Sequence, residues 1–440
     1  MRVLLIGGGG REHAIAEGAV RSGADLYCLM KNRNPGIMKI SRGVKIADET
    51  DVSAVCEFAR EVNPDLVHVG PEAPLEAGVV EHLEKMGILC ASPESGAAKI
   101  ETSKEFMRGV MTKYNIRGSL RYGVFDNERD AMGFVDAIGE VAVKPIGLTG
   151  GKGVKVTGDQ LRNRNDVLSY VKEVLEKGIG GHRRVLIEEK LEGEEFTLQA
   201  ITDGKTLVPT PLVQDHKRLL EGDTGPNTGG MGSYSCENHL LPFVKRRDME
   251  DALGIMRDVL LALNKEGVKF KGVLYGQFML TRSGPKVVEF NARFADPECM
   301  NILSLLVTPL TDLLEGAATG KLSGVRARFE NKATVCRYIV PRGYGLENPR
   351  SGVEISIDEG IKKTGCRVYY AAVDERDGKI YTTRSRSIAI VGIGDSLSDA
   401  EKMCSEGVQY VKGDIYYRKD IGTQELISRR IEHMKRLRGG

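Results

Sequence analysis

Two stretches of this chain are Lys144-Pro145-Ile146-Gly147-Leu148-Thr149-Gly150-Gly151-Lys152-Gly153-Val154 and Glu289-Phe290-Asn291-Ala292-Arg293-Phe294-Ala295-Asp296-Pro297-Glu298. The first is glycine-rich and carries two lysines, which predicts a flexible hairpin that can lie over phosphate groups. In the second, an acid, an amide and an arginine alternate at 289, 291 and 293, positions that share one face of a β-strand. Carboxylate and amide oxygens suit Mg²⁺ bound beside nucleotide phosphates. Together, the two stretches predict chemistry driven by ATP.

The glycine-rich stretch is not a Walker loop, which requires G-x-x-x-x-G-K-[ST]. Ile146 stands at the first glycine position, and Gly153 replaces the hydroxyl residue. Lys152 is placed to neutralise phosphoryl charge. An ordinary surface hairpin is the alternative for this stretch, and a polar surface strand is the alternative for 289–293.

Length and composition narrow the class of protein. At 440 residues, the chain is too long for one hydrophobic core and should divide into about two to four domains. A net charge of +2 gives no broad field that would recruit nucleic acid or an anionic membrane, so neither is an expected partner. The eight cysteines contain no CxxC pair, which argues against a zinc or redox motif. No apolar run is long enough to span a bilayer or to form a signal peptide, and we expect a cytoplasmic protein.

Strand and helix patterns alternate along the first hundred residues. Strands are predicted at 3–6, 25–30 and 66–69, and helices at 12–22, 52–61 and 74–86. This alternation predicts a parallel doubly wound α/β sheet, with ligands at the carboxyl ends of its strands. Mixed strands and helices follow up to about 320, with a polar, glycine-rich stretch at 214–235 that is long for a structureless loop. From about 330, β-rich segments and a helix at 396–410 predict a small α+β domain.

The first strand is followed by Gly7-Gly8-Gly9-Gly10-Arg11-Glu12, where backbone N–H groups can approach a phosphate at a helix N-terminus. The loop fails the G-x-G-x-x-G dinucleotide fingerprint. The second strand ends in Lys31-Asn32-Arg33, without the acid that would bind an NAD ribose. We therefore predict a monophosphate site near Arg11, with a simple strand–helix turn as the alternative.

Two further stretches carry polar groups in quantity. The strand ending at Glu188-Glu189 can present its backbone to a purine, and Glu195, seven residues after Glu188, can accept ribose hydroxyls; a solvated acidic face is the alternative. The stretches Gln214–Arg218 and Asp223–Gly232 combine charges, amides, hydroxyls and glycines. They predict a loop around a small polar substrate, with a disordered segment as the alternative.

These stretches, in this order, closely resemble the phosphoribosylamine–glycine ligase family of the ATP-grasp superfamily. The resemblance also includes Val69–Leu75 and Arg418-Lys419-Asp420-Ile421-Gly422, so it spans almost the whole chain. It implies a pre-ATP-grasp, Rossmann-like domain at 1–101 and an ATP-grasp domain at 102–328 with a mobile lid at about 120–190. A C-terminal α+β domain would occupy 329–440.

By position, the resemblance also implies the residues of the site. ATP would be bound by Lys104, Lys144, Gly150, Gly151, Lys152, Gly153, Glu188, Lys190, Leu191 and Glu195. The substrates would contact Gly9, Gly10, Arg11, Glu12, Pro71, Glu72, Asp215, Lys217, Pro226, Asn227, Thr228, Gly229, Gly230 and Arg293. Glu289 and Asn291 would bind Mg²⁺ or Mn²⁺, with the neutral Gln277 as a third candidate ligand. Catalytic roles fall to Arg293, Lys152 and Asp215.

The activity implied is the ligation of glycine to 5-phosphoribosylamine through glycyl phosphate, in a monomer or homodimer. Three alternatives are weighed against it. One is another ATP-grasp enzyme, such as a purine-pathway carboxylase or transformylase or a biotin carboxylase. Another is a nucleotide-binding regulator without catalysis. An NAD-binding oxidoreductase is the most distant because of the failed fingerprint.

Overall fold

The N-terminal sheet is parallel, as the sequence predicts. A computed structural model of the chain describes residues 1–147, 153–346 and 349–439. The sheet has the order β3-β2-β1-β4 (β1 Arg2–Ile6, β2 Asp25–Met30, β3 Gly43–Ile46, β4 Leu66–Val69). Val3, Leu4 and Leu5 are buried because helices cover the sheet, which is the arrangement that parallel crossovers produce. The helices are α1 Gly10–Arg21, α2 Pro35–Ile40, α3 Val52–Val62, α4 Glu72–Glu76 and α5 Val79–Lys85.

The predicted helix at 74–86 was wrong as a single helix. It is divided into α4 and α5 at Gly78, whose φ of 80° lies in the left-handed region. Glycine adopts that conformation at little cost, so it interrupts a run that is otherwise helical in pattern.

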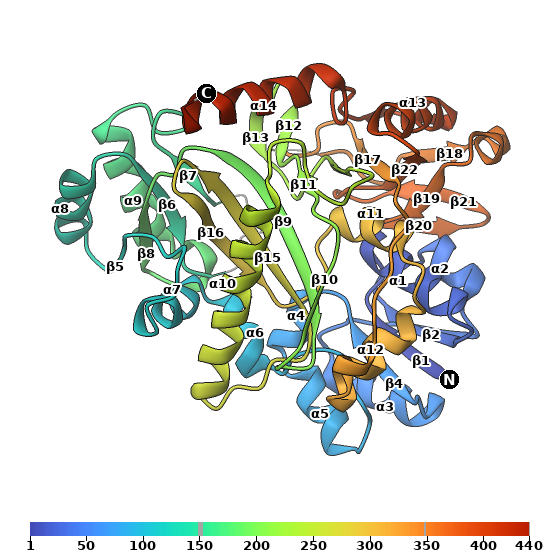
Figure 1. The fold of residues 1–440 in the computed structure, drawn as a ribbon. Helices are drawn as coiled ribbons and strands as arrows, with labels where there is room; N and C mark the ends of the chain where they lie inside the picture. Colours follow the sequence, from blue (N-terminus) through green and yellow to red (C-terminus); the bar gives the residue numbers. More distant parts are fainter. Residues whose placement is uncertain (148–152, 347–348, 440) are drawn as a thin grey trace.

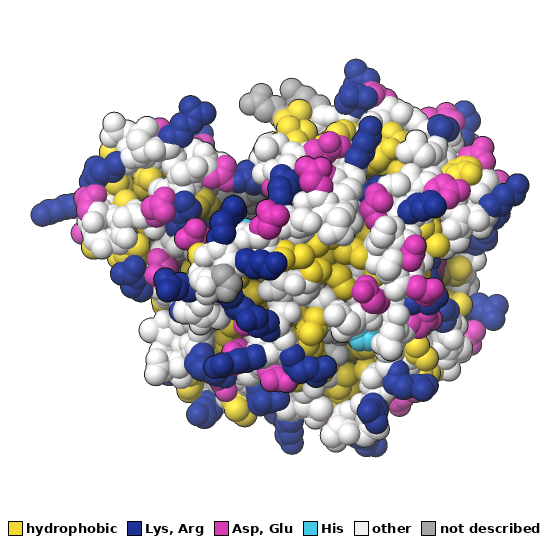
Figure 2. All heavy atoms as spheres, turned by 45° about the horizontal axis from the view of Figure 1, so that its top comes forward, with side chains coloured by type: hydrophobic (Ala, Val, Ile, Leu, Met, Phe, Trp, Pro, Cys, Tyr) yellow, Lys and Arg dark blue, Asp and Glu magenta, His cyan; other side chains and the backbone are white. Residues whose placement is uncertain are grey.

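The lid is a separate lobe on the left of Figure 1 and Figure 2. Its antiparallel sheet has the order β5-β8-β6-β7 (β5 Tyr122–Phe125, β6 Val141–Pro145, β7 Lys155–Val156, β8 Val185–Glu189). The helices α8 Glu128–Ile138 and α9 Arg164–Lys177 pack on it. Val143, Val171 and Ile187 belong to a hydrophobic core that is distinct from the main one. A lobe with its own core can move as a unit.

A second sheet faces the lid across the ATP-grasp domain. Its order is β10-β9-β15-β16 (β9 Glu194–Thr202, β10 Leu207–Pro209, β15 Gly272–Thr281, β16 Gly284–Asn291). The helices α6 Ser95–Thr102, α7 Lys104–Lys113 and α10 Arg246–Lys265 lie beside it (Figure 1). The register between β15 and β16 shifts between Gln277 and Phe278, next to the predicted metal ligands.

The stretch predicted as a long polar loop, 214–235, contains four short strands. They are β11 Gln214–Asp215, β12 Arg218–Leu220, β13 Thr224–Asn227 and β14 Gly232–Ser235. Strands β12 and β13 form a separate hairpin, whereas β14 pairs with β17 of the C-terminal region. Two strands from inside the ATP-grasp region therefore complete the C-terminal sheet.

That C-terminal sheet has six strands in the order β11-β14-β17-β22-β19, with β24 added on β17. Its remaining strands are β17 Ala333–Pro341, β19 Arg367–Tyr370, β22 Ile388–Gly394 and β24 Ile415–Tyr416. A smaller sheet contains β18 Glu354–Ile357, β20 Val373–Arg376, β21 Lys379–Thr382 and β23 Val411–Lys412. The helices are α11 Glu298–Leu305, α12 Leu310–Thr319 and α13 Leu397–Gly407. The α+β prediction for this region is confirmed.

The last helix, α14 Gln424–Arg438, crosses back over the ATP-grasp domain (Figure 1). Its His433 Nδ1 lies 2.6 Å and its Arg430 Nη1 3.0 Å from the buried carboxylate of Glu194, at the start of β9. Basic and acidic side chains are intermixed on the face shown in Figure 2. Among the described residues, no helix combines the length and apolar character needed to cross a membrane.

Candidate active site

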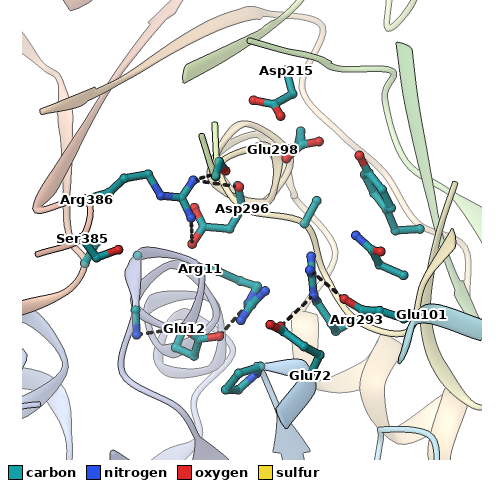
Figure 3. Close-up of a pocket in the computed structure, with 18 of the residues that line it drawn as sticks. Arg11, Glu12, Glu72, Glu101, Asp215, Arg293, Asp296, Glu298, Ser385 and Arg386 are labelled. Atoms are coloured by element: carbon teal, nitrogen blue, oxygen red, sulfur yellow. Dashed lines mark hydrogen bonds and ion pairs between the residues drawn. The ribbon is translucent and has the colours of Figure 1, made fainter. Parts of the chain in front are cut away.

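A cavity of about 430 Å³ lies where the three parts of the chain meet (Figure 3). The N-terminus of α1 and the turn after β4 form one wall, and the end of β16 with the segment before α11 forms another. The C-terminal region closes it with Tyr338, Ser385 and Arg386. Fourteen predicted residues line this cavity: Gly9, Gly10, Arg11, Glu12, Pro71, Glu72, Lys104, Asp215, Lys217, Thr228, Gly229, Glu289, Asn291 and Arg293.

Glu289 and Asn291 are separated by one residue on β16, and both face the same cavity. Arg293 faces it too, although β16 ends at Asn291, so the expectation that all three lie on one strand was wrong for the arginine. A carboxylate and an amide oxygen side by side are suitable ligands for a hard divalent cation that also binds water and phosphate. The donor set therefore fits the predicted metal.

Gln277, opposite Glu289 on β15, takes part in a polar chain. Its Oε1 accepts a hydrogen bond from Lys217 Nζ, and its Nε2 donates to Glu195 Oε2 at 2.6 Å. Lys217 Nζ also lies 3.4 Å from Glu289 Oε1. Both ends of the Gln277 amide are thus used by neighbouring side chains, and a role for Gln277 in metal binding stays a prediction.

Three charged side chains are buried together between α7 and the lid sheet. Arg108 Nε and Lys144 Nζ each lie 2.6 Å from a Glu188 oxygen, and the guanidinium also donates to the backbone oxygens of Val287 and Val288. Burial alone would raise the pKa of Glu188, but Arg108 and Lys144 outweigh it and lower the pKa to about 2. The triad connects the lid strand β8 to the strand that carries Glu289.

The low pKa of Glu188 has a consequence for acid stability. A carboxyl group with a depressed folded-state pKa stabilises the protein fully above its ordinary value of 4.5. This contribution is lost as pH falls from 4.5 towards about 2. We expect the difference in unfolding free energy between wild type and Glu188→Gln to be constant from about pH 6 to about pH 5. The difference should shrink as the pH falls below 4.5. Urea unfolding at a series of pH values measures it, and a difference that grows with acid would contradict the expectation.

Arg293 is held by two acids on the N-terminal side of the cavity. Its Nη2 lies 2.8 Å from Glu101 Oε1, and its Nε lies 3.5 Å from Glu72 Oε2 (Figure 3). Burial raises the pKa of Glu101 to about 7, although Arg293 acts in the opposite direction. Nη1 of Arg293 donates to the Phe294 carbonyl at 3.2 Å, and its Nε–H, which faces Glu72, makes no hydrogen bond within the described part of the chain. Each Nη carries a second N–H, and a guanidinium with unused N–H groups can bind a substrate carboxylate.

The predicted phosphate loop brings bare backbone to the cavity. A Cβ at Gly9 would lie 2.6 Å from Glu12 Oε2, and one at Gly10 would collide with the hydroxyl of Tyr338, so a side chain at either position would require its neighbour to move. The Gly9 N–H already donates to Glu12 Oε2 at 2.8 Å, and Arg11 Nε donates to the other oxygen of Glu12 at 2.6 Å. Two of the predicted phosphate contacts are therefore paired within the chain.

Arg386 and Ser385 belong to the cavity but were missed, because no motif surrounds them in the sequence. Arg386 Nη1 donates to the backbone oxygens of Gly230 and Asp296, and its guanidinium stacks 4.4 Å from the ring of Tyr338. Asp296 and Glu298 also line the cavity. Both lie in the stretch Glu289–Glu298, and the signal that could have assigned them was their position immediately after the predicted metal strand.

Other predicted residues do not line this cavity. Lys144, Gly153, Glu188, Glu195, Pro226, Asn227, Gly230 and Gln277 are not among its lining residues, and Lys190 and Leu191 border a second hollow beside α14. Pro226 and Asn227 lie on β13 of the separate hairpin. Lys104 Nζ, which does line the cavity, donates to the Gly147 carbonyl at 3.0 Å. Gly150, Gly151 and Lys152 are outside the described residues.

A parallel N-terminal domain, a lid sheet and a second sheet with an acid and an amide at its edge define an ATP-grasp protein. Models of phosphoribosylglycinamide synthetase match the chain in three parts: the N domain at 1–101, the ATP-grasp (A) domain at 102–299 and the C domain at 334–424. The chain belongs to the phosphoribosylglycinamide synthetase family, whose members are also named phosphoribosylamine–glycine ligase.

Individual relatives agree with this family. The phosphoribosylamine–glycine ligase of Methanocaldococcus jannaschii is 52% identical over 445 residues, with 100% of both chains covered. That of Pyrococcus horikoshii is 49% identical, covering 99% of this chain and 98% of the relative. The crystal structure of phosphoribosylamine–glycine ligase from Thermotoga maritima superposes with a TM-score of 0.79 at 27% identity, covering 96% of this chain and 100% of that chain. A biotin carboxylase domain from Hydrogenobacter thermophilus, in complex with MgADP, shares the fold alone, at 14% identity, TM-score 0.72, and coverage of 99% and 93%.

Proposed function

We propose that this chain joins glycine to 5-phosphoribosylamine at the expense of ATP, giving glycinamide ribonucleotide, ADP and phosphate. The observation that carries the proposal is the convergence of Glu289, Asn291 and Arg293 on one cavity that Gly8, Gly9 and Gly10 also line. One side suits a nucleotide with its cation and an amino-acid carboxylate, and the other suits a phosphorylated sugar.

The reaction needs activation because a carboxylate and an amine do not condense in water. A glycine carboxylate oxygen attacks the γ-phosphorus of ATP, and ADP leaves. The neutral amine of phosphoribosylamine then attacks the carbonyl of glycyl phosphate, phosphate leaves, and the new amide nitrogen loses a proton. The protein forms no covalent bond in this sequence, so catalysis consists of positioning and of charge stabilisation.

The side chains divide this work. Arg293, fixed by Glu101 and Glu72, orients the glycine carboxylate through its remaining N–H groups. Lys104 and Lys144 would contact the nucleotide, and Glu289 with Asn291 would hold Mg²⁺ or Mn²⁺. A cation there would neutralise phosphate charge during transfer. Closure of the lid would exclude water from an acyl phosphate that hydrolyses readily.

One assay tests this function against its alternatives. Purified protein is incubated with ATP, Mg²⁺, freshly made phosphoribosylamine and either glycine, bicarbonate or formate, and ADP is measured. ADP release that requires glycine supports the proposal. Release with bicarbonate or formate instead would indicate a carboxylase or transformylase, and bound but uncleaved ATP would indicate a regulator.

A further inference from the structure

The side chain of Asn34 joins two walls of the cavity that are far apart in the sequence. Asn34 is fully buried and caps the N-terminus of α2. Its Nδ2 donates to the carbonyl of Gly8 at 2.9 Å and to that of Tyr370 at 2.8 Å. Gly8 lines the cavity from the N-terminal domain, and Ala371, which follows Tyr370, lines it from the C-terminal region. One amide group therefore bridges the glycine loop and the C-terminal wall.

The peptide group between Gly8 and Gly9 is held on both of its sides. Its carbonyl accepts from Asn34, and its N–H, on Gly9, donates to Glu12 Oε2 at 2.8 Å. A peptide group is planar, so a hydrogen bond on each side fixes the direction in which the plane faces. The orientation of the glycine loop at the start of α1 therefore depends on Asn34.

The backbone of Tyr370 is held by side chains of the N-terminal domain at both of its polar groups. Its carbonyl accepts from Asn34, and its N–H donates to His13 Nδ1 at 2.9 Å. Burial lowers the pKa of His13 to about 3, so the ring is neutral and Nδ1 can accept this bond. Beside them, the Glu375 N–H donates to the Arg33 carbonyl at 3.0 Å. Specific polar contacts thus fix the C-terminal wall against the N-terminal domain.

Helix capping alone does not explain an asparagine here. The Oδ1 of Asn34 accepts from the N–H groups of Gly36 at 3.0 Å and Ile37 at 3.3 Å, which is the capping role. Aspartate or serine would serve that role as well, because a cap needs only the oxygen. The two hydrogens on Nδ2 are both used for the bridge, and only the amide supplies them. A buried amide with all of its groups paired specifies one arrangement of its neighbours.

We propose that Asn34 is a positioning residue for the half of the cavity that binds phosphoribosylamine. This inference rests on the proposed function, which assigns the phosphorylated sugar to the side of the cavity with Gly8, Gly9 and Gly10. The Asn34 amide sets the spacing between these glycines and the C-terminal wall. The predicted metal ligands belong to β16, a different part of the cavity. Loss of the bridge should therefore weaken binding of the sugar substrate and leave binding of ATP and glycine as it was.

Asn34→Asp tests the bridge because a carboxylate keeps the cap and loses both donors. A carboxylate that faces two carbonyl oxygens repels them, so the two walls should move apart. We expect the KM for phosphoribosylamine to rise about 10- to 100-fold, as a displacement on the order of 1 Å would cause, with the KM values for glycine and ATP unchanged. Initial rates of ADP release, with each substrate varied in turn, measure the three values. A merely structural role would reduce the amount of active enzyme, and so the maximal rate, without moving any KM.

Asn163→Asp is the matched control. Asn163 is an exposed cap of α9 in the lid, and its Oδ1 accepts from the N–H groups of Asn165 at 2.9 Å and Asp166 at 3.0 Å. The control makes the same chemical change at the same position of a helix, and it should keep all three KM values. Asn34→Ser retains a neutral cap without the amide. It should also raise the KM for phosphoribosylamine, by less than Asn34→Asp because it adds no charge.

Failure of this inference and failure of the proposed function give different results. If wild type releases no ADP with glycine and phosphoribosylamine, the function itself is wrong. If wild type is active but Asn34→Asp and Asn34→Ser keep its KM for phosphoribosylamine, the positioning role is overturned. A rise of all three KM values by the same factor would overturn it too, since it would indicate a general loosening of the structure. If Asn34→Asp does not fold by circular dichroism, Asn34→Ser alone is judged by the same criteria.

Discussion

Glu289→Ala is expected to lower turnover by roughly 10²–10³-fold, the usual cost of one lost electrostatic contact in a preorganised site. Of the two predicted metal ligands, Glu289 is the one that carries a carboxylate. Its Oε1 also lies 3.4 Å from Lys217 Nζ. Its side chain is 36% exposed, so truncation leaves no sealed hollow and the fold should survive. Steady-state ADP release at saturating substrates measures the loss, and circular dichroism with a melting curve checks the fold.

Two comparisons make the Glu289 result specific. Glu289→Gln keeps an oxygen ligand but removes the charge, and should require more Mg²⁺ for half-maximal activity than wild type does. Glu237→Ala, which removes an exposed acid, should behave as wild type. Activity of Glu289→Ala equal to that of wild type would reject the metal assignment.

Glu188→Gln is expected to lower the free energy of unfolding by about 3–5 kcal/mol, the range found when one member of a buried ion pair is removed. The substitution leaves Arg108, which is fully buried, and Lys144, which is 7% exposed, without their shared counter-charge. Both cations lose water on folding, and the Glu188 carboxylate compensates for that loss, whereas a neutral amide would not. The midpoint of urea unfolding should therefore fall markedly.

The next residue along the chain provides the control. Glu189 pairs with Arg121, whose side chain is 66% exposed, so solvent screens that interaction. Glu189→Gln should cost about 1 kcal/mol or less. Equal losses for the two variants would mean that the Arg108–Glu188–Lys144 group contributes no more than a surface pair.

Local patterns in the sequence predicted many of the residues that line the cavity. The alternation of Glu289 and Asn291 placed both on one face of β16, and the glycines after β1 marked a backbone approach that side chains would block. These features depend on residues a few positions apart, for which strand and helix periodicity is a reliable guide.

Features that depend on distant segments were not predictable in this way. Arg386 reaches the cavity only because the C-terminal sheet folds against α1, and Glu101 meets Arg293 from the end of α6. The strands within 214–235 are short and carry few apolar residues, so their own composition predicted a loop. Of these strands, β14 pairs with the distant β17, and β11 pairs with β14. Gly78 gave a local signal for the break between α4 and α5, but the helical pattern around it concealed that signal.

The pairing of β14 with β17 means that the chain cannot be cut at about 328 without a structural penalty. A shortened protein would expose the backbone N–H and C=O groups along one side of β14 to solvent or to other molecules, which favours aggregation. It would also lose Tyr338 and Arg386 from the cavity. The C-terminal region is therefore as much a part of the substrate chamber as the nucleotide-binding core is, and a mutation that loosens it should reduce ligation even though it lies far along the chain from Glu289.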